Sequence, residues 1–186
     1  HVRKTEGSDG VLIVDDSIGE KHSTDENDII CWHYDHSQHR AVKGINFVTC
    51  LYHCQGVSLP VGFEIVRKTE RYIDPKSGKE KRRSNRTKNE MYRDLMAQAV
   101  KNQIPFKYAL NDIWFASAEN MNFVKITLEK EFVMPLKGNR KVATSAEAKQ
   151  NGRYQSVDTL ELEPLHPVIV YLEGVEFPLL LVKQVF

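Results

Sequence analysis

Apolar runs of strand length alternate with polar stretches along the first part of the chain. Residues 10–14 read Gly-Val-Leu-Ile-Val and are followed by two aspartates and a serine. Branched aliphatic residues bounded by a glycine and a polar turn are typical of a buried central strand, and the polar residues 17–27 predict a loop after it. Residues 45–52 and 58–66 are rich in β-branched and aromatic side chains, and Gly56 separates them. They are predicted to form a β-hairpin.

After residue 86 the apolar residues recur with the spacing of a helix. Thr87 and Glu90 have the spacing of a capping box, which predicts a helix start. The helix should end near Asn102, and its apolar stripe consists of Tyr92, Leu95, Met96 and Ala99. A strand at 106–111, a helix at 117–128 with Met121, Val124 and Leu128 inward, and a strand at 131–134 are predicted to follow.

This order of three strands, helix, strand, helix and strand predicts the α/β class, with an RNase H-like mixed sheet and flanking helices. In that arrangement the first and fourth predicted strands are neighbours. Asp15 ends the first of them and Asp112 the fourth, at the edge where open α/β sheets usually place ligands. Two converging carboxylates outline a divalent-metal site, since hard cations take oxygen ligands. Either aspartate could instead simply start a loop.

The pattern changes after residue 141. Residues 160–163 alternate, and the apolar runs 168–172 and 177–182 follow without a helical segment between them. We therefore expect two parts, an α/β core at residues 1–141 and a β-rich unit at residues 142–186. The chain stops at Phe186 inside a strand-like run, so we expect a fragment of a longer protein.

Composition excludes several classes of protein. Hydrophobic residues make up 41% and charged residues 27% of the chain, as in ordinary globular domains. No run of eighteen apolar residues exists, so we expect no membrane-spanning segment, and we find no signal peptide. Three cysteines argue against a disulfide framework and for a reducing compartment.

Positive charge is concentrated in one segment although the net charge is only +1. Residues 67–88 hold ten Lys or Arg side chains against three acidic ones, and Tyr72 is their only aromatic residue. This predicts an exposed loop that contacts DNA phosphates without reading bases, although such loops are often only solvated. The candidate DNA-binding residues are Arg82, Arg83 and Arg86 in this loop, and Lys137, Asn139 and Arg140 further along.

Soft ligands also occur, in the form of Cys31, His33, Cys50, His53 and Cys54. Their spacing matches no standard zinc finger, and strand alternation would separate His53 from both neighbouring cysteines. Buried structural side chains are therefore the preferred interpretation over a zinc site.

Six short motifs, taken together and in order, resemble DDE transposases of bacterial insertion sequences. They run from about residue 11 to 141: Asp15-Asp16-Ser17 with Glu20-Lys21, residues 31–36, 42–47, 59–63, 111–115 and 136–140. The resemblance implies an RNase H-like catalytic domain, two Mg²⁺ or Mn²⁺ ions, and cut-and-paste hydrolysis and strand transfer at transposon ends. It also implies a β-rich insertion between the second Asp and a catalytic Glu, which fits residues 142–186.

The resemblance assigns the catalytic and metal-binding residues. The first Asp corresponds to Asp15, because related enzymes read Asp-x-Ser there, with Asp16 as the second choice. The second corresponds to Asp112. The third member, a Glu on a late helix, has no counterpart here, so this chain alone is expected to be inactive. A non-catalytic nucleic-acid-binding remnant of a transposase is the alternative.

The resemblance also implies partners and location. We expect double-stranded DNA, both transposon ends and target, bound by a homodimer, with no membrane association. The expected location is the bacterial cytoplasm, at the nucleoid.

Overall fold

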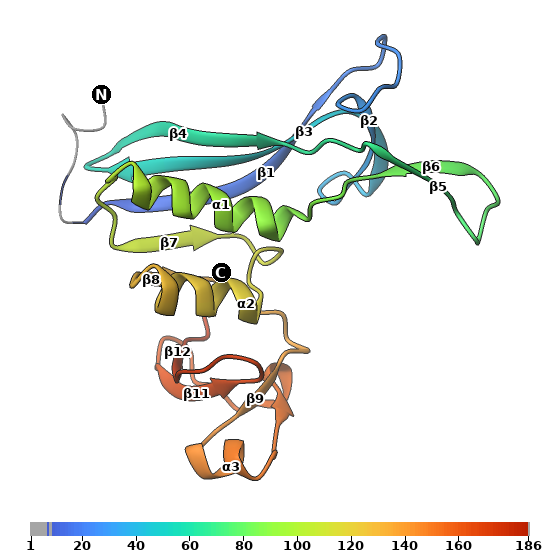
Figure 1. The fold of residues 1–186 in the computed structure, drawn as a ribbon. Helices are drawn as coiled ribbons and strands as arrows, with labels where there is room; N and C mark the ends of the chain where they lie inside the picture. The colour runs from blue at the N-terminus through green and yellow to red at the C-terminus, as the bar shows by residue number, and fades with distance from the viewer. Residues whose placement is uncertain (1–6, 8, 186) are drawn as a thin grey trace. The chain divides into compact units, whose positions relative to one another are not determined.

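The computed structural model describes residue 7 and residues 9–185. The chain divides into two compact units, residues 1–110 and 111–186 (Figure 1). The predicted boundary at residues 141 and 142 remains a prediction. Helices and strands are both present, as the α/β class predicted, and no described helix is long and apolar enough to cross a membrane.

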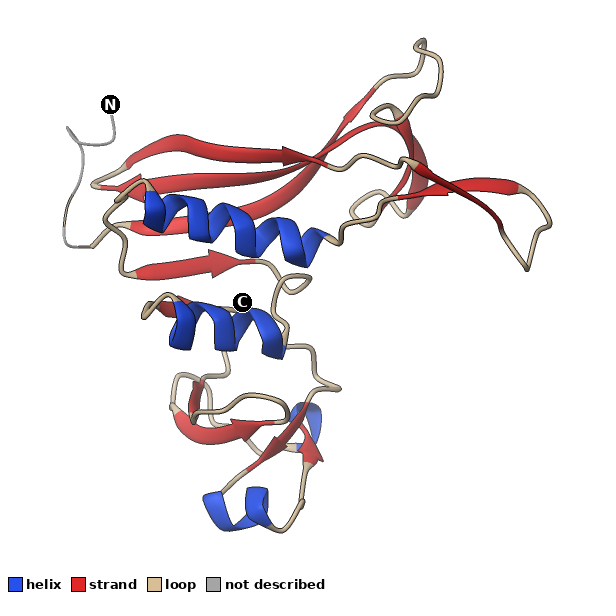
Figure 2. Cartoon of the chain, in the orientation of Figure 1, coloured by secondary structure: helices blue, strands red, loops and turns tan. Residues whose placement is uncertain are grey.

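The first unit is built on a sheet in which β3 is the central long strand (Figure 2). The strands are β1 (Val11–Glu20), β2 (Cys31–Asp35), β3 (Arg40–Cys54), β4 (Val57–Ile65) and β7 (Tyr108–Asn111). Their order is β2-β3-β1-β7, and β4 also pairs with β3. Strand β3 pairs antiparallel with β1, β2 and β4. The predicted neighbourhood of the first and fourth strands is confirmed by β1 and β7.

Strand β1 is longer than the sequence predicted. The prediction of a loop from residue 17 is wrong up to Glu20, because β1 keeps its register with β3 as far as the pair Glu20 and Gly44. Strand β3 begins at Arg40 and supplies hydrogen-bonding partners to this polar part of β1. Strand β2 was not anticipated. It pairs with the first residues of β3.

Helix α1 (Lys88–Lys101) packs against β3 and β4. The capping box of Thr87 and Glu90 is present, and the helix ends at Asn102, both as predicted. Its buried residues are Met91, Tyr92, Leu95, Met96 and Ala99. Alternate residues of β1 and β3 are buried, among them the cross-strand pairs Leu12–Tyr52 and Val14–Cys50. The buried face of this sheet is therefore the one with Leu12 and Val14.

The basic segment 67–88 is not a loop throughout. It contains β5 (Glu70–Ile73) and β6 (Glu80–Arg83), which form a two-stranded antiparallel sheet. Neither strand joins the larger sheet. Glu70 lies opposite Arg83 and forms an ion pair with it, and Glu80 forms an ion pair with Arg71 across the strands. This cross-strand attraction supports a hairpin that composition alone did not indicate.

The second unit holds the short helical segment at residues 118–127 and a small sheet. Helix α2 (Ala118–Asn122), capped by Ser117, continues as a π-helical turn (Phe123–Thr127), and β8 (Glu131–Val133) follows. The four-stranded sheet has the order β10 (Gln155–Ser156), β9 (Lys141–Ala143), β11 (Val168–Leu172), β12 (Leu179–Leu181). Helix α3 (Ala146–Gln150) follows β9, and a 3₁₀ turn (Val157–Thr159) follows β10.

The sheet of the second unit closes over an apolar core that includes Met121, Val142, Val170 and Leu172. The predicted strands at 168–172 and 177–182 correspond to β11 and β12. The alternation at residues 160–163 does not form a strand.

Candidate functional site

Asp15 and Asp16 point to opposite faces of β1. Asp15 lies opposite Thr49 of β3, and Asp16 lies opposite the fully buried Val48. Asp15 is exposed, whereas the side chain of Asp16 is only 19% exposed. Strand alternation therefore separates the two carboxylates.

The carboxylate of Asp16 is held by two partners on the buried side of the sheet. It forms an ion pair with Lys88, the first residue of α1. Its Oδ2 also accepts a hydrogen bond from Asn46 Nδ2 at 3.2 Å. Asp16 is thus already neutralised by this chain, which makes it a poor candidate for binding a metal ion.

Asp15 has a different environment. Its Oδ1 accepts a hydrogen bond from the backbone N–H of Asp16 at 2.8 Å, and its carbonyl oxygen accepts one from Thr49 Oγ1 at 3.2 Å. Among the described residues, none forms an ion pair with the Asp15 carboxylate. An exposed carboxylate oriented by a neighbouring amide and left without a cation has the donor chemistry that Mg²⁺ and Mn²⁺ require.

Asp112 immediately follows β7 and is half-buried. Its Oδ1 accepts a hydrogen bond from the backbone N–H of Trp114 at 2.9 Å, and its carbonyl oxygen accepts one from Asn111 Nδ2 at 2.8 Å. These bonds fix the turn that follows the strand. Asp15 lies in the first unit and Asp112 in the second, so the predicted approach of the two carboxylates remains a prediction.

Buried polar side chains lie on the buried side of β2 and β3, and sequence reasoning missed them as a group. Asn46 is 0% exposed, and its Oδ1 has no hydrogen-bonding partner among the described residues. Burial, together with the positive charges of Lys68 and Lys88, lowers the pKa of His33 to about 4. His33 is therefore neutral at pH 7. The sequence feature that could have indicated this group is Asn46, a polar residue at a position where the alternation of the strand predicts a buried side chain.

Cysteines 31, 50 and 54 are free and buried, as the preferred interpretation predicted. The Sγ of Cys31 lies 3.5 Å from His33 Nε2. His53 instead contacts Ser58 through Nδ1 at 2.8 Å. Within residue 7 and residues 9–185, no group of three or more His, Cys, Asp or Glu side chains is placed to hold a metal ion.

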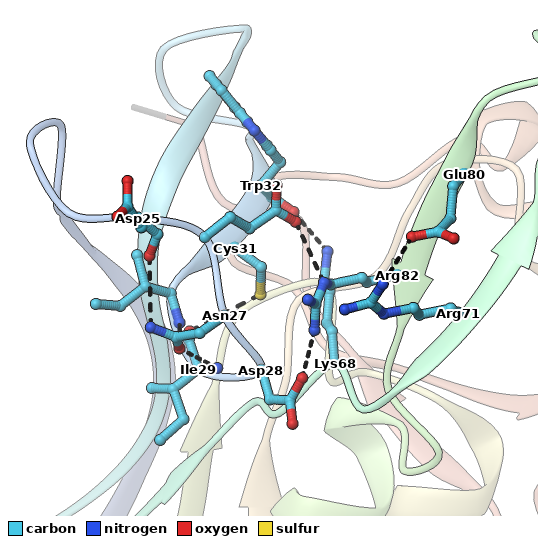
Figure 3. Close-up of polar contacts among 12 residues, drawn as sticks. Asp25, Asn27, Asp28, Ile29, Cys31, Trp32, Lys68, Arg71, Glu80 and Arg82 are labelled. Atoms are coloured by element: carbon cyan, nitrogen blue, oxygen red, sulfur yellow. Dashed lines mark hydrogen bonds and ion pairs between the residues drawn. The ribbon is translucent and has the colours of Figure 1, made fainter.

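Arg82 is an anchoring residue in this structure. Its side chain is only 15% exposed, and it forms ion pairs with Asp28 and, at 3.6 Å, with Glu26. Lys68 lies beside it and donates a hydrogen bond from Nζ to the carbonyl oxygen of Trp32 at 2.6 Å (Figure 3). These contacts tie the β5–β6 hairpin to the loop before β2.

The other two arginines of this segment that were predicted to bind DNA also have acidic partners. Arg83 pairs with Glu70 at 2.8 Å, and its guanidinium lies 5.5 Å from the centre of the Tyr72 ring. Arg86 pairs with Asp94 and, at 3.5 Å, with Glu64. The positive charge of this segment is therefore partly balanced within the first unit, which the count of charges along the sequence could not reveal. DNA contact by these arginines remains a prediction.

The remaining predicted DNA-binding residues lie between β8 and β9 in the second unit. Lys137 Nζ lies 3.9 Å from the centre of the Trp114 ring. Trp114 itself follows Asp112 by two positions. Arg140 donates a backbone hydrogen bond to the carbonyl oxygen of Lys137 at 3.0 Å, which closes a turn, and Asn139 is exposed on it. Lys137 is thus placed next to the turn that carries Asp112, and a DNA-contacting role for the three stays a prediction.

Comparison with known proteins gives one match. The family model described as "DDE superfamily endonuclease" matches residues 2–157. No curated protein and no solved structure matches the chain. The match covers most of the chain, so the chain belongs to the DDE superfamily endonucleases, as the resemblance to DDE transposases predicted.

Proposed function

We propose that this chain is part of the catalytic domain of a DNA transposase, which hydrolyses phosphodiester bonds at transposon ends and then transfers the freed strand. The observation that carries the proposal is the contrast between two neighbouring aspartates. Asp16 is neutralised by Lys88, whereas Asp15 is exposed, oriented by an amide, and without a cation among the described residues. Family membership supports the nuclease class, and this contrast supports Asp15 as the first catalytic carboxylate.

The proposed cofactors are two divalent ions, Mg²⁺ or Mn²⁺, held by Asp15 and Asp112. Such ions, when bound, stabilise the attacking and leaving oxygens of a phosphodiester. The chain's own contribution is orientation. The backbone N–H of Asp16 fixes one oxygen of Asp15, and the turn after β7 fixes one oxygen of Asp112. Each carboxylate also has a second oxygen, and carboxylate oxygens are the ligand type that these ions take.

We further propose that residues 1–141 belong to an RNase H-like core and that residues 142–186 belong to a β-rich insertion in it. The central position of β1 between β3 and β7, and the cover that α1 gives to one face, support this assignment. The third carboxylate, the Glu on a late helix, is not assigned to a residue of this chain. The inactivity expected without it remains a prediction.

The proposed substrate is double-stranded DNA, bound by a homodimer at the bacterial nucleoid. Arg83, Arg86, Lys137, Asn139 and Arg140 are the proposed phosphate contacts, because charge-assisted contacts of this kind position a duplex without reading its sequence. Arg82 is better assigned to anchoring the hairpin, because its guanidinium is engaged by Glu26 and Asp28.

Metal binding by the variants Asp15→Asn, Asp112→Asn and Asp16→Asn tests this proposal. Mn²⁺ titration followed by electron paramagnetic resonance should show bound Mn²⁺ for the wild type and for Asp16→Asn, and much weaker binding for the other two. Mg²⁺ should correspondingly raise the melting temperature of the wild type and of Asp16→Asn more than that of the other variants.

The three substitutions are isosteric and each removes one negative charge, so Asp16→Asn is a matched control. Equal Mn²⁺ binding by all four proteins would remove the site from Asp15 and Asp112. Loss of binding only in Asp16→Asn would move the first ligand to Asp16.

A further inference from the structure

The hairpin of β5 and β6 is a free-standing two-stranded ribbon (Figure 1). Each strand has four residues, which gives a paired length of about 13 Å at the usual rise per residue. The ribbon extends away from the main sheet of the first unit, and both of its outer edges lack a partner strand within the described part of the chain. A two-stranded β-ribbon is one of the elements that the major groove of B-DNA, about 12 Å wide, admits.

The tip of the ribbon has a fixed shape because Asp74 organises it. Asp74 Oδ2 accepts hydrogen bonds from Ser77 Oγ at 2.6 Å and from Lys81 Nζ at 2.5 Å. These bonds lower the pKa of Asp74 to about 2, so its carboxylate stays charged across the physiological range. The turn closes through backbone bonds between Asp74 and Lys79 at 2.9 Å and between Gly78 and Asp74 at 2.8 Å. Gly78 adopts a φ of +65°, which glycine accepts without strain.

This fixed tip presents positive charge that the chain does not balance. Lys76 and Lys79 are exposed, and neither forms an ion pair with a described residue. Ile73, which is 63% exposed, lies just before the turn. Two lysines with an apolar side chain beside them, on a narrow rigid ribbon, suit a groove that has phosphates on both sides and base edges at its floor.

The base of the ribbon is fixed as firmly as its tip. Arg82 joins β6 to Glu26 and Asp28 (Figure 3). Tyr72 lies under the guanidinium of Arg83, so the ribbon's only aromatic ring is covered on that side. A ribbon that is anchored at its base, and whose only aromatic ring is covered on one side, suits duplex DNA better than single-stranded DNA, whose bases stack on exposed aromatic rings.

We propose that the β5–β6 ribbon inserts its tip into the major groove of duplex DNA, with Lys76 and Lys79 on the flanking phosphates and Ile73 against the base edges. This deepens the proposed function, on which it rests for the choice of DNA as partner. Arg82 sets the direction of the ribbon through its acidic partners and does not itself contact DNA.

Duplex binding by the full chain in EDTA tests the ribbon independently of metal chemistry. Fluorescence anisotropy should give a salt slope that falls by about 1.8 in the variant Lys76→Gln/Lys79→Gln, because each lost phosphate contact removes about 0.9 from the slope. Affinity at 0.1 M salt should fall by up to about sixtyfold, which is the effect of a slope change of 1.8 over the decade from 1 M salt. The matched control Lys101→Gln/Lys183→Gln, which removes two exposed lysines elsewhere, should bind as the wild type does.

Blocking one groove at a time tests the mode of binding. In duplexes with glucosylated 5-hydroxymethylcytosine the major groove is filled, so the wild type should bind them more weakly than plain duplexes. The affinity of the tip variant, Lys76→Gln/Lys79→Gln, should differ little between the two kinds of duplex. Netropsin, which fills the minor groove, should not compete. An unchanged salt slope in the tip variant, displacement by netropsin alone, or no duplex binding in EDTA would each overturn the ribbon proposal.

The Mn²⁺ titration separates failure of the ribbon from failure of the proposed function. The tip variant should bind Mn²⁺ like the wild type, because its substitutions lie outside the carboxylate site. A protein that binds duplex DNA through its tip but has no Asp15-dependent Mn²⁺ binding would keep the ribbon and lose the transposase assignment.

Discussion

Lys88, the first residue of α1, forms an ion pair with Asp16, the residue next to the candidate metal ligand Asp15. A lysine at this position is locally unfavourable, because the amino end of a helix carries partial positive charge. The position of Lys88 is therefore explained by its contact with β1 and not by the helix itself. The ion pair holds the start of α1 against β1 and fixes the strand at the point where Asp15 turns to the opposite face.

We predict that Asp16→Asn destabilises the protein more than Asp15→Asn does. Asp16 loses a charge-assisted contact in a poorly solvated position, which should lower the free energy of unfolding by about 1–2 kcal/mol. Asp15 is exposed, so the same isosteric change should alter that energy by less than about 0.5 kcal/mol. Urea unfolding in EDTA measures both. A larger loss for Asp15→Asn would contradict the assignment of faces and roles.

A double-mutant cycle with Lys88→Met isolates the pair itself. If the ion pair between Asp16 and Lys88 stabilises the protein, the double variant should lose clearly less free energy of unfolding than the two single variants lose in sum. Additive losses would mean that the pair contributes nothing and that each side chain acts separately.

His33 should make stability depend on pH. Its folded-state pKa is lowered to about 4, mainly by burial and then by Lys68 and Lys88, whereas the unfolded chain takes up the proton near pH 6.5. Stability should be complete above about pH 6.5 and fall as the pH drops toward 4. Between pH 7.5 and pH 5 the loss from this group should be about 2 kcal/mol.

Urea unfolding of His33→Gln at both pH values checks this origin. The variant should lose less stability on acidification than the wild type. An unchanged pH dependence in His33→Gln would assign the effect to another group.

Gly44→Ala should be among the more damaging small substitutions in the first unit. A Cβ at this position would lie 2.4 Å from the carbonyl oxygen of Gly19 and 3.0 Å from Cα of Glu20. Both are backbone atoms of β1, so relief requires the strands to move apart, at a cost of about 2–3 kcal/mol. In Gly19→Ala the nearest atom would be Phe47 Cε2 at 3.6 Å. Thermal unfolding of the two variants should therefore differ clearly, and similar melting temperatures would contradict this close approach.

The parts of the fold that were predicted correctly depend on local signals. The start of α1 follows from Thr87 and Glu90 alone, and the turn between β3 and β4 from Gly56, whose φ is +76°. The polar end of β1 has no such signal. Its residues are strand because β3 lies alongside them. The β5–β6 ribbon could not be predicted for a related reason. Its charged residues form pairs only between the two strands, and a count of charges along the sequence cannot distinguish such a hairpin from a solvated loop.

In the candidate site, too, local features could be predicted from the sequence and tertiary contacts could not. Alternation along a strand is a local property, and it is enough to place neighbouring residues such as Asp15 and Asp16 on opposite faces. The partner that neutralises Asp16 could not be predicted, because Lys88 lies 72 positions further along the chain. Arg82 is a similar case. Its acidic partners Glu26 and Asp28 precede it by more than fifty positions, so its sequence context indicated only a positive charge.

The ribbon's separation from the main sheet bears on how this protein can change over evolutionary time. Strands β5 and β6 exchange backbone hydrogen bonds with each other and join no other described strand. Substitutions at the tip, or a change in its length, therefore leave the register of β1 and β3 untouched. If the ribbon binds DNA as we propose, its DNA-binding properties can change between lineages while β1 and β3 stay constant. Exchanging this one hairpin between relatives should then transfer those properties without altering the main sheet.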